Sequence, residues 1–133
     1  MSYLISTKGR YALRVMIDMA EQGGDAIVPL KDIANRQELS LKYLEAIMPR
    51  LKEAGLVLSV AGKGGGYKLS RPVDQYTVGE ILKVSEEQLA PVACLNEGFI
   101  CAKSETCKTL PIWRKLDGII SDYLETVMLT DLL

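Results

Sequence analysis

The sequence contains no histidine among its 133 residues. Without imidazole it lacks the usual general base near neutral pH, and nothing in it resembles the nucleophile motif G-x-S-x-G. No stretch approaches the roughly 20 consecutive apolar residues of a membrane span. The N-terminus, MSYLISTKGR, lacks the apolar segment of a signal peptide. We therefore expect a cytoplasmic protein that has no contact with a membrane and is not an enzyme.

Cysteine is scarce as well, and the net charge is close to zero. Three cysteines in a cytoplasmic protein are more typical of free thiols or ligands than of a disulfide framework. The net charge of −1 hides an uneven distribution. Residues 1–72 carry 11 Lys/Arg and 7 Asp/Glu, whereas residues 73–133 carry 5 and 10. A basic first half suggests contact with a polyanion, although chance clustering of solvated charges explains the charges alone equally well.

Three helices are predicted in the first half. Apolar residues at three- and four-residue spacing predict a helix over residues 7–21. A short helix follows over residues 29–37, with Pro29 in its first turn. Ser40 suits the N-cap of a third helix. Pro49 lies inside this third helix and is expected to kink or break it, because proline removes one backbone hydrogen bond.

Two β-prone segments come next. They are LVLSV (56–60) and YKLS (67–70), and the Gly-rich sequence AGKGGG joins them. Two short strands around such a turn predict a β-hairpin. The order of helix, helix, capped helix and hairpin is typical of a winged helix-turn-helix. We expect a mainly α-helical fold with a small β-hairpin wing, and a DNA-binding domain over residues 1–72.

The second half is expected to contain two more helices and a loop. Thr77 and Glu80 form the capping-box pattern T-x-x-E, which predicts a short helix through about Ser85. Residues 86–109 hold all three cysteines and show no periodicity, so we expect a loop. Pro111 suits the first turn of a long last helix. Its apolar residues predict a coiled-coil-like seam, made of Trp113, Leu116, Ile120, Tyr123, Leu124 and Val127.

The third helix carries candidates for DNA recognition. A helix-turn-helix places the N-terminal residues of its second helix against base edges in the major groove. Here those residues are Ser40, Lys42, Tyr43 and Glu45. Serine can donate or accept, glutamate can accept from a cytosine amino group, and lysine and tyrosine can reach phosphates or bases. Each residue alone has an ordinary explanation as a cap or a solvated side chain, but the ordered set favours DNA recognition.

The hairpin turn carries a second set of candidates. Gly64 and Gly65 have no Cβ and tolerate positive φ, so the backbone there can approach DNA closely. Lys63 and Lys68 supply positive charge that can reach phosphates. Taken singly, the glycines need do no more than turn a hairpin. Together with the third helix, they predict a wing that contacts DNA.

These segments resemble a known family. The resemblance is carried by STKGRYALR, LSLKYLEAIMPRLKEAGLV and AGKGGGYKLSRP, and continues through TVGEILKV, the cysteine loop and LPIWRKLDGIISDYLETVMLTDLL. Together they resemble the Rrf2 family, which includes IscR, NsrR and CymR. The resemblance implies a winged-helix transcriptional regulator, expected to be a repressor, that binds palindromic double-stranded DNA operators. It also implies a homodimer built on the last helix, about residues 111–127, so that residues 73–133 hold the cysteine loop and the dimerisation helix.

The resemblance extends to individual DNA contacts. It implies that Ser40, Tyr43 and Glu45 contact DNA from the recognition helix. Relatives often carry an arginine in the wing that enters a minor groove, where this sequence has Ala61. The expected minor-groove contact therefore does not carry over directly, and Lys63 is the candidate replacement.

The three cysteines are candidate ligands of an iron–sulfur cluster. Cys94, Cys101 and Cys107 have the spacing C-x6-C-x5-C, and thiolates are the usual cluster ligands. Cluster-bearing members of the family place three cysteines in this loop. The resemblance therefore implies a [2Fe-2S] or [4Fe-4S] cluster that senses redox, iron or nitric oxide status. Zinc is disfavoured, because structural zinc sites usually have C-x2-4-C pairs and four protein ligands.

The fourth ligand of such a cluster is unknown. Resemblance to IscR places a histidine at about Leu110, and resemblance to NsrR places an acid of the partner's first helix at Arg10. Position 110 holds no histidine and position 10 holds no acid in this sequence. The open alternatives are solvent, a small thiol, a group from the partner chain, or a local oxygen of Asn96, Glu97 or Glu105.

Three other functions remain open from the sequence. A CymR-like regulator would respond to a regulatory protein partner, with the cysteines incidental. A thiol switch would use the cysteines without a metal. A small redox protein would carry the cluster and would not bind DNA even at low salt.

Overall fold

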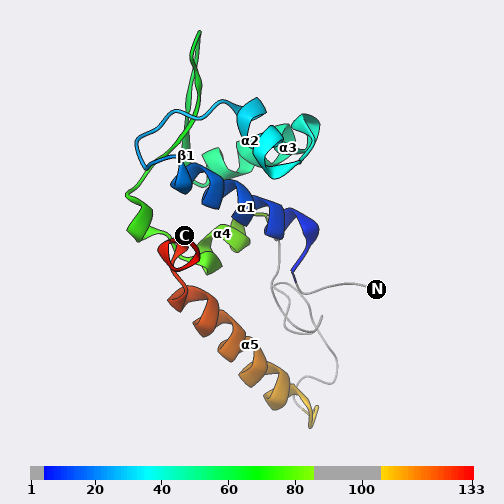
Figure 1. The fold of residues 1–133 in the computed structure, drawn as a ribbon. Helices are drawn as coiled ribbons and strands as arrows, with labels where there is room; N and C mark the ends of the chain where they lie inside the picture. Colours follow the sequence, from blue (N-terminus) through cyan, green and yellow to red (C-terminus); the bar gives the residue numbers. More distant parts are fainter. Residues whose placement is uncertain (1–4, 86–105) are drawn as a thin grey trace.

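The computed structural model describes residues 5–85 and 106–133. A helical head carries a β-hairpin at one end, and a long helix projects from the other (Figure 1). This is the predicted winged-helix fold. The helices are α1 (Thr7–Glu21), α2 (Leu30–Gln37), α3 (Leu41–Glu53), α4 (Val78–Ser85) and α5 (Leu110–Thr126), with short 3-10 helices η1 (Val73–Gln75) and η3 (Leu129–Leu132). The strands are β1 (Val57–Val60) and β2 (Gly66–Leu69).

Side-chain caps explain where α1 and α3 begin. The Ser6 hydroxyl accepts a hydrogen bond from the Gly9 backbone N–H at 3.2 Å, and the Ser40 hydroxyl accepts one from the Tyr43 N–H at 3.1 Å. Each cap satisfies one of the backbone donors that a helix start leaves without a partner. The predicted N-cap of the third helix is therefore confirmed. Helix α2 begins one residue later than predicted, because Pro29 has an extended backbone and is its N-cap.

Of the two outcomes expected at Pro49, a kink or a break, the break does not occur. Helix α3 continues through Pro49 to Glu53. Proline at this position removes the hydrogen bond to the carbonyl of Glu45, four residues earlier. Both residues are exposed, so water can solvate the carbonyl that has lost its partner. The cost of the missing bond is smallest on this face.

The hairpin is antiparallel, and its turn depends on glycine. The strands pair with Val57 opposite Leu69 and Val60 opposite Gly66. A Cβ on Gly65 would lie 2.2 Å from the Val60 carbonyl oxygen, closer than any side chain allows. The outer edge of β2 is also paired, since Val28 and Tyr67 exchange two backbone hydrogen bonds at 2.8 and 2.9 Å. The base of the wing is thereby attached to the segment before α2.

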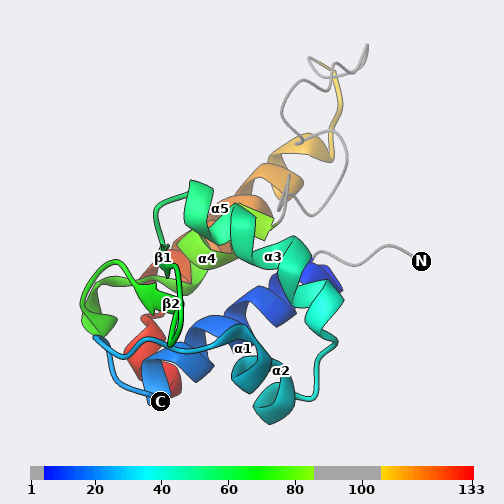
Figure 2. The same ribbon diagram turned by 90° about the horizontal axis from the view of Figure 1, so that it is seen from above.

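One hydrophobic core connects α1 to the other elements of the head. Its members include Met16 and Met19 from α1, Leu44 and Met48 from α3, and Ile81 from α4. Viewed from above, α2 and α3 flank α1, and the hairpin lies beyond the C-terminal end of α3 (Figure 2). The helix pair and the wing therefore pack against the same hydrophobic core.

Tyr76 joins the hairpin to the start of α4, a role that the sequence did not reveal. Its side chain is fully buried. The hydroxyl donates to the Leu56 carbonyl at 2.7 Å and accepts from the backbone N–H groups of Ser70 and Arg71, both at 3.0 Å. The guanidinium of Arg71 lies 4.5 Å from the centre of the Tyr76 ring. One phenol thus holds both ends of the hairpin.

Helix α5 is attached to the head near its C-terminal end. The Thr77 and Met128 backbones form a β-bridge, and the Val78 N–H donates to the Val127 carbonyl at 2.8 Å. Lys83 on α4 forms an ion pair with Glu125 at 2.7 Å. The hydrogen bond from Lys83 lowers the pKa of the Glu125 carboxyl below its ordinary value. We name this attachment the α4–α5 joint.

The residues of the predicted apolar seam on α5 differ in their exposure. Trp113, Ile120, Leu124 and Val127 are half-buried. The exposed stripe instead contains Ile112, Leu116, Ile119 and Tyr123, which are 60%, 38%, 57% and 66% exposed. Their spacing of four, three and four residues keeps them on one face of the helix. Among the described residues, no helix is long and apolar enough to cross a membrane.

Candidate nucleic-acid interface

The N-terminal turn of α3 presents its polar side chains to solvent. Ser40, Lys42 and Glu45 are all exposed. The Ser40 hydroxyl caps α3, which leaves its second lone pair and its proton for other partners. The helix N-terminus adds a partial positive charge that favours a phosphate. The structure thus gathers the predicted recognition residues at one accessible helix end.

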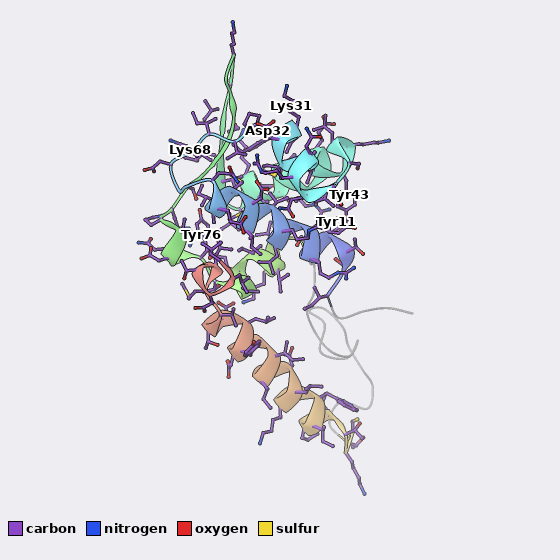
Figure 3. The ribbon with its side chains drawn as sticks, in the orientation of Figure 1. Tyr11, Lys31, Asp32, Tyr43, Lys68 and Tyr76 are labelled. Atoms are coloured by element: carbon purple, nitrogen blue, oxygen red, sulfur yellow. The ribbon has the colours of Figure 1, made fainter. Side chains whose placement is uncertain are left out.

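Tyr43 is placed differently from its neighbours on α3. It is half-buried, and its ring packs edge to face against Tyr11 of α1, with ring centres 5.2 Å apart at 75° (Figure 3). Edge-to-face pairs of this geometry are favourable. The sequence could not show this contact, because the two tyrosines belong to different helices. The structure gives Tyr43 a packing role, and its contact with DNA stays a prediction.

The two lysines of the hairpin lie at different points along it, one in the turn and one on β2. Lys63 is exposed in the turn beside Gly64, and Lys68 is half-buried on β2 opposite Leu58. Gly64 has φ +79°, a left-handed conformation that favours glycine. Lys31, on α2, is exposed and points toward the end of the molecule that carries the hairpin (Figure 3). Sequence reasoning missed Lys31, because nothing in its local pattern distinguishes it from a solvated lysine.

An ion pair beneath the helix-turn-helix links α1 to α2. The Asp18 side chain is only 2% exposed, and it accepts hydrogen bonds from Arg36 Nη2 at 2.7 Å and Nε at 3.0 Å. The hydrogen bond to Asp18 raises the pKa of the Arg36 guanidinium above its ordinary value. Removing one partner would leave a buried charge without compensation. The position of the last turn of α2 is therefore tightly tied to α1.

The cysteine loop lies mostly outside the described residues, including Cys94, Cys101 and the candidate oxygen ligands Asn96, Glu97 and Glu105. Cys107 is half-buried just before α5, with its Sγ 3.3 Å from the Thr109 Oγ1. Leu110 is buried at the start of α5, and Arg10 is exposed on α1. Neither side chain has the chemistry of an iron ligand, so the two positions at which the resemblance implied a fourth ligand offer none.

These features define a winged helix-turn-helix DNA-binding protein. They are the pair of helices α2 and α3, the exposed N-terminal end of α3, and the wing with its glycine turn. The comparisons with known proteins give the family. The chain belongs to the Rrf2 family, whose model, described as an iron-dependent transcriptional regulator, matches residues 5–133. The protein is therefore a DNA-binding transcriptional regulator and not an enzyme.

Individual relatives agree with this assignment. The HTH-type transcriptional regulator IscR of Erwinia tasmaniensis is 41% identical over 129 residues, which are 96% of this chain and 77% of that protein. The structure of CymR, the global cysteine regulator of B. subtilis, matches with a TM-score of 0.78 and 38% identity, covering 99% of this chain and 96% of that one. T. potens IscR matches with a TM-score of 0.76 and 38% identity, covering 96% and 84%.

Proposed function

We propose that this protein is a cytoplasmic homodimeric repressor that binds a palindromic DNA operator. It senses redox, iron or nitric oxide status through an iron–sulfur cluster. Residues 1–72 carry the DNA contacts, and residues 73–133 carry the cluster and the dimer contacts. This is a division of function, since side chains from both segments share one core. Ser40, Lys42, Tyr43 and Glu45 contact DNA from α3, and Lys63, Gly64, Gly65 and Lys68 from the wing.

The exposure of the N-terminal part of α3 is the observation that best supports the proposed DNA contacts. Ser40, the N-cap, and Glu45 are both exposed on a helix that has another face buried. Each good base contact adds about 1–3 kcal/mol of discrimination between base pairs. Lys42, Lys63 and Lys68 neutralise phosphates, so affinity falls steeply as salt is raised.

The exposed stripe on α5 supports the dimer. It contains Ile112, Leu116, Ile119 and Tyr123, and it leaves four large apolar side chains exposed on one face. Apolar residues at four- and three-residue spacing are the pattern by which two helices pack into a seam. A second copy of α5 covers the stripe by twofold symmetry. Dimerisation brings two recognition helices to two half-sites, about one helical turn of DNA apart.

The chemistry of the donor set fits an iron–sulfur cluster. Cys94, Cys101 and Cys107 supply soft thiolate ligands, and Cys107 lies partly exposed three residues before α5. When bound, the cluster supplies an iron centre that responds to oxidants or nitric oxide. Cys107 as a ligand constrains the start of the dimer helix. The fourth ligand is not a histidine, because the chain has none.

The likeness to CymR favours a second candidate, a regulator without a cluster. CymR of B. subtilis matches over 96% of its chain at 38% identity. In this candidate a partner protein or a thiol switch controls DNA binding. The fold and the DNA contacts are the same in both candidates, so only the cysteines distinguish them.

Anaerobic purification followed by absorption spectroscopy, with iron and sulfide analysis, tests the cluster. A brown protein with a thiolate-to-iron band and matched iron and sulfide supports the sensor. The matched control is the triple variant Cys94→Ala, Cys101→Ala, Cys107→Ala, which should stay colourless and should bind operator DNA with altered affinity. A wild-type protein that stays colourless and iron-free after reconstitution would contradict the cluster and favour the second candidate.

A further inference from the structure

A strip of side chains on α1 holds both ends of the turn that leads into the recognition helix. Tyr11, Arg14 and Asp18 are spaced by three and four residues, so they lie on one face of α1. Tyr11 reaches the first turn of α3, and Arg14 and Asp18 reach the last turn of α2. Figure 3 shows Tyr11 beside Tyr43, where these helices meet. We name the three residues the α1 strip.

Arg14 binds the last residue of α2 twice. Its Nε donates to the side-chain oxygen of Gln37 at 3.2 Å, and its Nη2 donates to the Gln37 backbone carbonyl. That carbonyl belongs to the last turn of the helix, where backbone oxygens have no partner within the helix. The Gln37 amide nitrogen in turn donates to Asp18 at 3.1 Å. Both ends of the amide are therefore engaged, and its orientation is fixed.

The same guanidinium also contacts the aromatic pair at the start of α3. Its central carbon lies 5.4 Å from the centre of the Tyr11 ring, and Tyr11 packs against Tyr43. A planar guanidinium can stack on a ring while its N–H groups donate in its plane. Lysine, a point charge on a flexible stem, cannot do both. Arg14 is thus the member of the strip that connects α2 and α3.

We infer that Arg14 is a positioning residue for DNA recognition, which fixes the direction in which α3 presents Ser40 and Glu45 without touching DNA itself. Three residues, 38–40, separate Gln37 from the start of α3, so the exit of α2 directs the entry of α3. Apolar packing beneath the helices is not directional, whereas hydrogen bonds are. This inference rests on the proposed reading of DNA by α3.

The test measures specificity separately from affinity. The wild-type protein first enriches a preferred sequence from a library of randomised duplexes. Wild type, Arg14→Met, Arg14→Lys and the control Arg10→Met are then titrated with that duplex and with a scrambled duplex, across a salt series. Arg10 is the matched control, because it is an exposed arginine one turn earlier whose guanidinium bonds Thr7 of its own helix at 3.4 Å. Circular dichroism verifies that each variant is folded at the assay temperature.

Both Arg14 variants should bind the enriched duplex about tenfold more weakly, the size of one lost base contact. Their affinity for the scrambled duplex should change by less than roughly twofold, because the phosphate contacts persist. Arg10→Met should keep the wild-type ratio of the two affinities.

Two results would overturn the inference. The first is that Arg14→Lys binds the enriched duplex as tightly as wild type, which would mean that charge suffices. The second is that Arg14→Met loses affinity equally for both duplexes while its salt slope falls by about one, as expected for a phosphate contact. Failure of the proposed function would look different, because the wild-type protein itself would then enrich no sequence.

Discussion

Glu45 and Lys63 are both exposed on the surface that we propose faces DNA, yet their substitutions should have different effects. Glu45→Ala should change the base preference at one operator position, costing about 1–3 kcal/mol of discrimination, because its carboxylate can accept from a base edge. Lys63→Ala should weaken binding to every sequence and lower the salt slope by about one. Titration of an operator and its single-base variants in a salt series measures both.

Lys52→Ala is the control for this pair, because Lys52 is exposed in the last turn of α3, far along the helix from its recognition end. It should leave base preference unchanged. Equal loss of affinity for operator and random DNA by Glu45→Ala would contradict the role assigned to this carboxylate.

Glu38 is the described residue other than glycine that has a positive φ, at +54°. Its Cβ is strained in this left-handed conformation, which ends α2. Glu38→Gly should raise the free energy of unfolding by about 0.5–1 kcal/mol, because relief of strain exceeds the added freedom of the unfolded chain. Urea denaturation measures the change. Glu38→Ala is the control, and an equal gain in that variant would assign the effect to the lost charge.

Some residue roles could be predicted from the sequence and others could not. The Ser40 cap was predictable, because it depends on the segment from Ser40 to Tyr43 and on no distant group. The Tyr43 ring contact with Tyr11 was not, since it depends on how two helices pack. Arg14 likewise looks like a solvated arginine until Gln37 is placed beside it. The candidate recognition residues come from their position in a pattern, whereas the residues that hold them were not predicted from the sequence.

At the scale of elements, the hairpin should depend on one buried hydroxyl. Tyr76→Phe would remove the hydroxyl that bonds the Leu56 carbonyl and the Ser70 and Arg71 N–H groups. The Ser70 N–H would keep its 3.3 Å bond to the Leu56 carbonyl, whereas the Arg71 N–H would lose its acceptor. We expect a loss of about 1–3 kcal/mol in the free energy of unfolding, the cost of buried polar groups left unpaired. Denaturant unfolding measures it.

Tyr67→Phe is the control, because the described residues offer no hydrogen bond to the Tyr67 hydroxyl. It should change the unfolding midpoint little. A Tyr76→Phe protein as stable as wild type would show that water replaces the phenol at the base of the wing.

Helix and strand positions were largely predictable, because periodicity and caps are local. The confirmed elements include α1, α3 with its cap, and the hairpin. Helix α3 continues through Pro49, because the hydrogen bond that proline removes lies on an exposed face. The capping-box prediction was half right: the Glu80 N–H donates to Thr77 at 3.1 Å, but the Glu80 carboxylate pairs with Arg71 at 2.5 Å. Local patterns predicted the elements, whereas contacts between distant segments determined which partners the side chains bind.

For the whole molecule, the proposed dimer contact is the exposed stripe on α5. Ile119→Asp should convert the dimer to a monomer, because it places a carboxylate in the apolar seam at the position of a 57% exposed isoleucine. Analytical ultracentrifugation measures the mass. Ser121→Asp is the control, since it adds the same charge to the opposite side of α5 and should stay dimeric. A dimeric Ile119→Asp protein would place the dimer contact elsewhere.

The α4–α5 joint turns the long helix into a lever. Helix α5 has 17 residues and is therefore about 25 Å long, with the joint near one end and Cys107 just beyond the other. A tilt of about 5° over this length moves the head by about 2 Å. In the proposed dimer the second head moves oppositely, so their separation changes by about 4 Å, close to the roughly 3.4 Å rise of one base pair. The relative affinity for operators whose half-sites differ in spacing by a single base pair would then report the state of the cysteines.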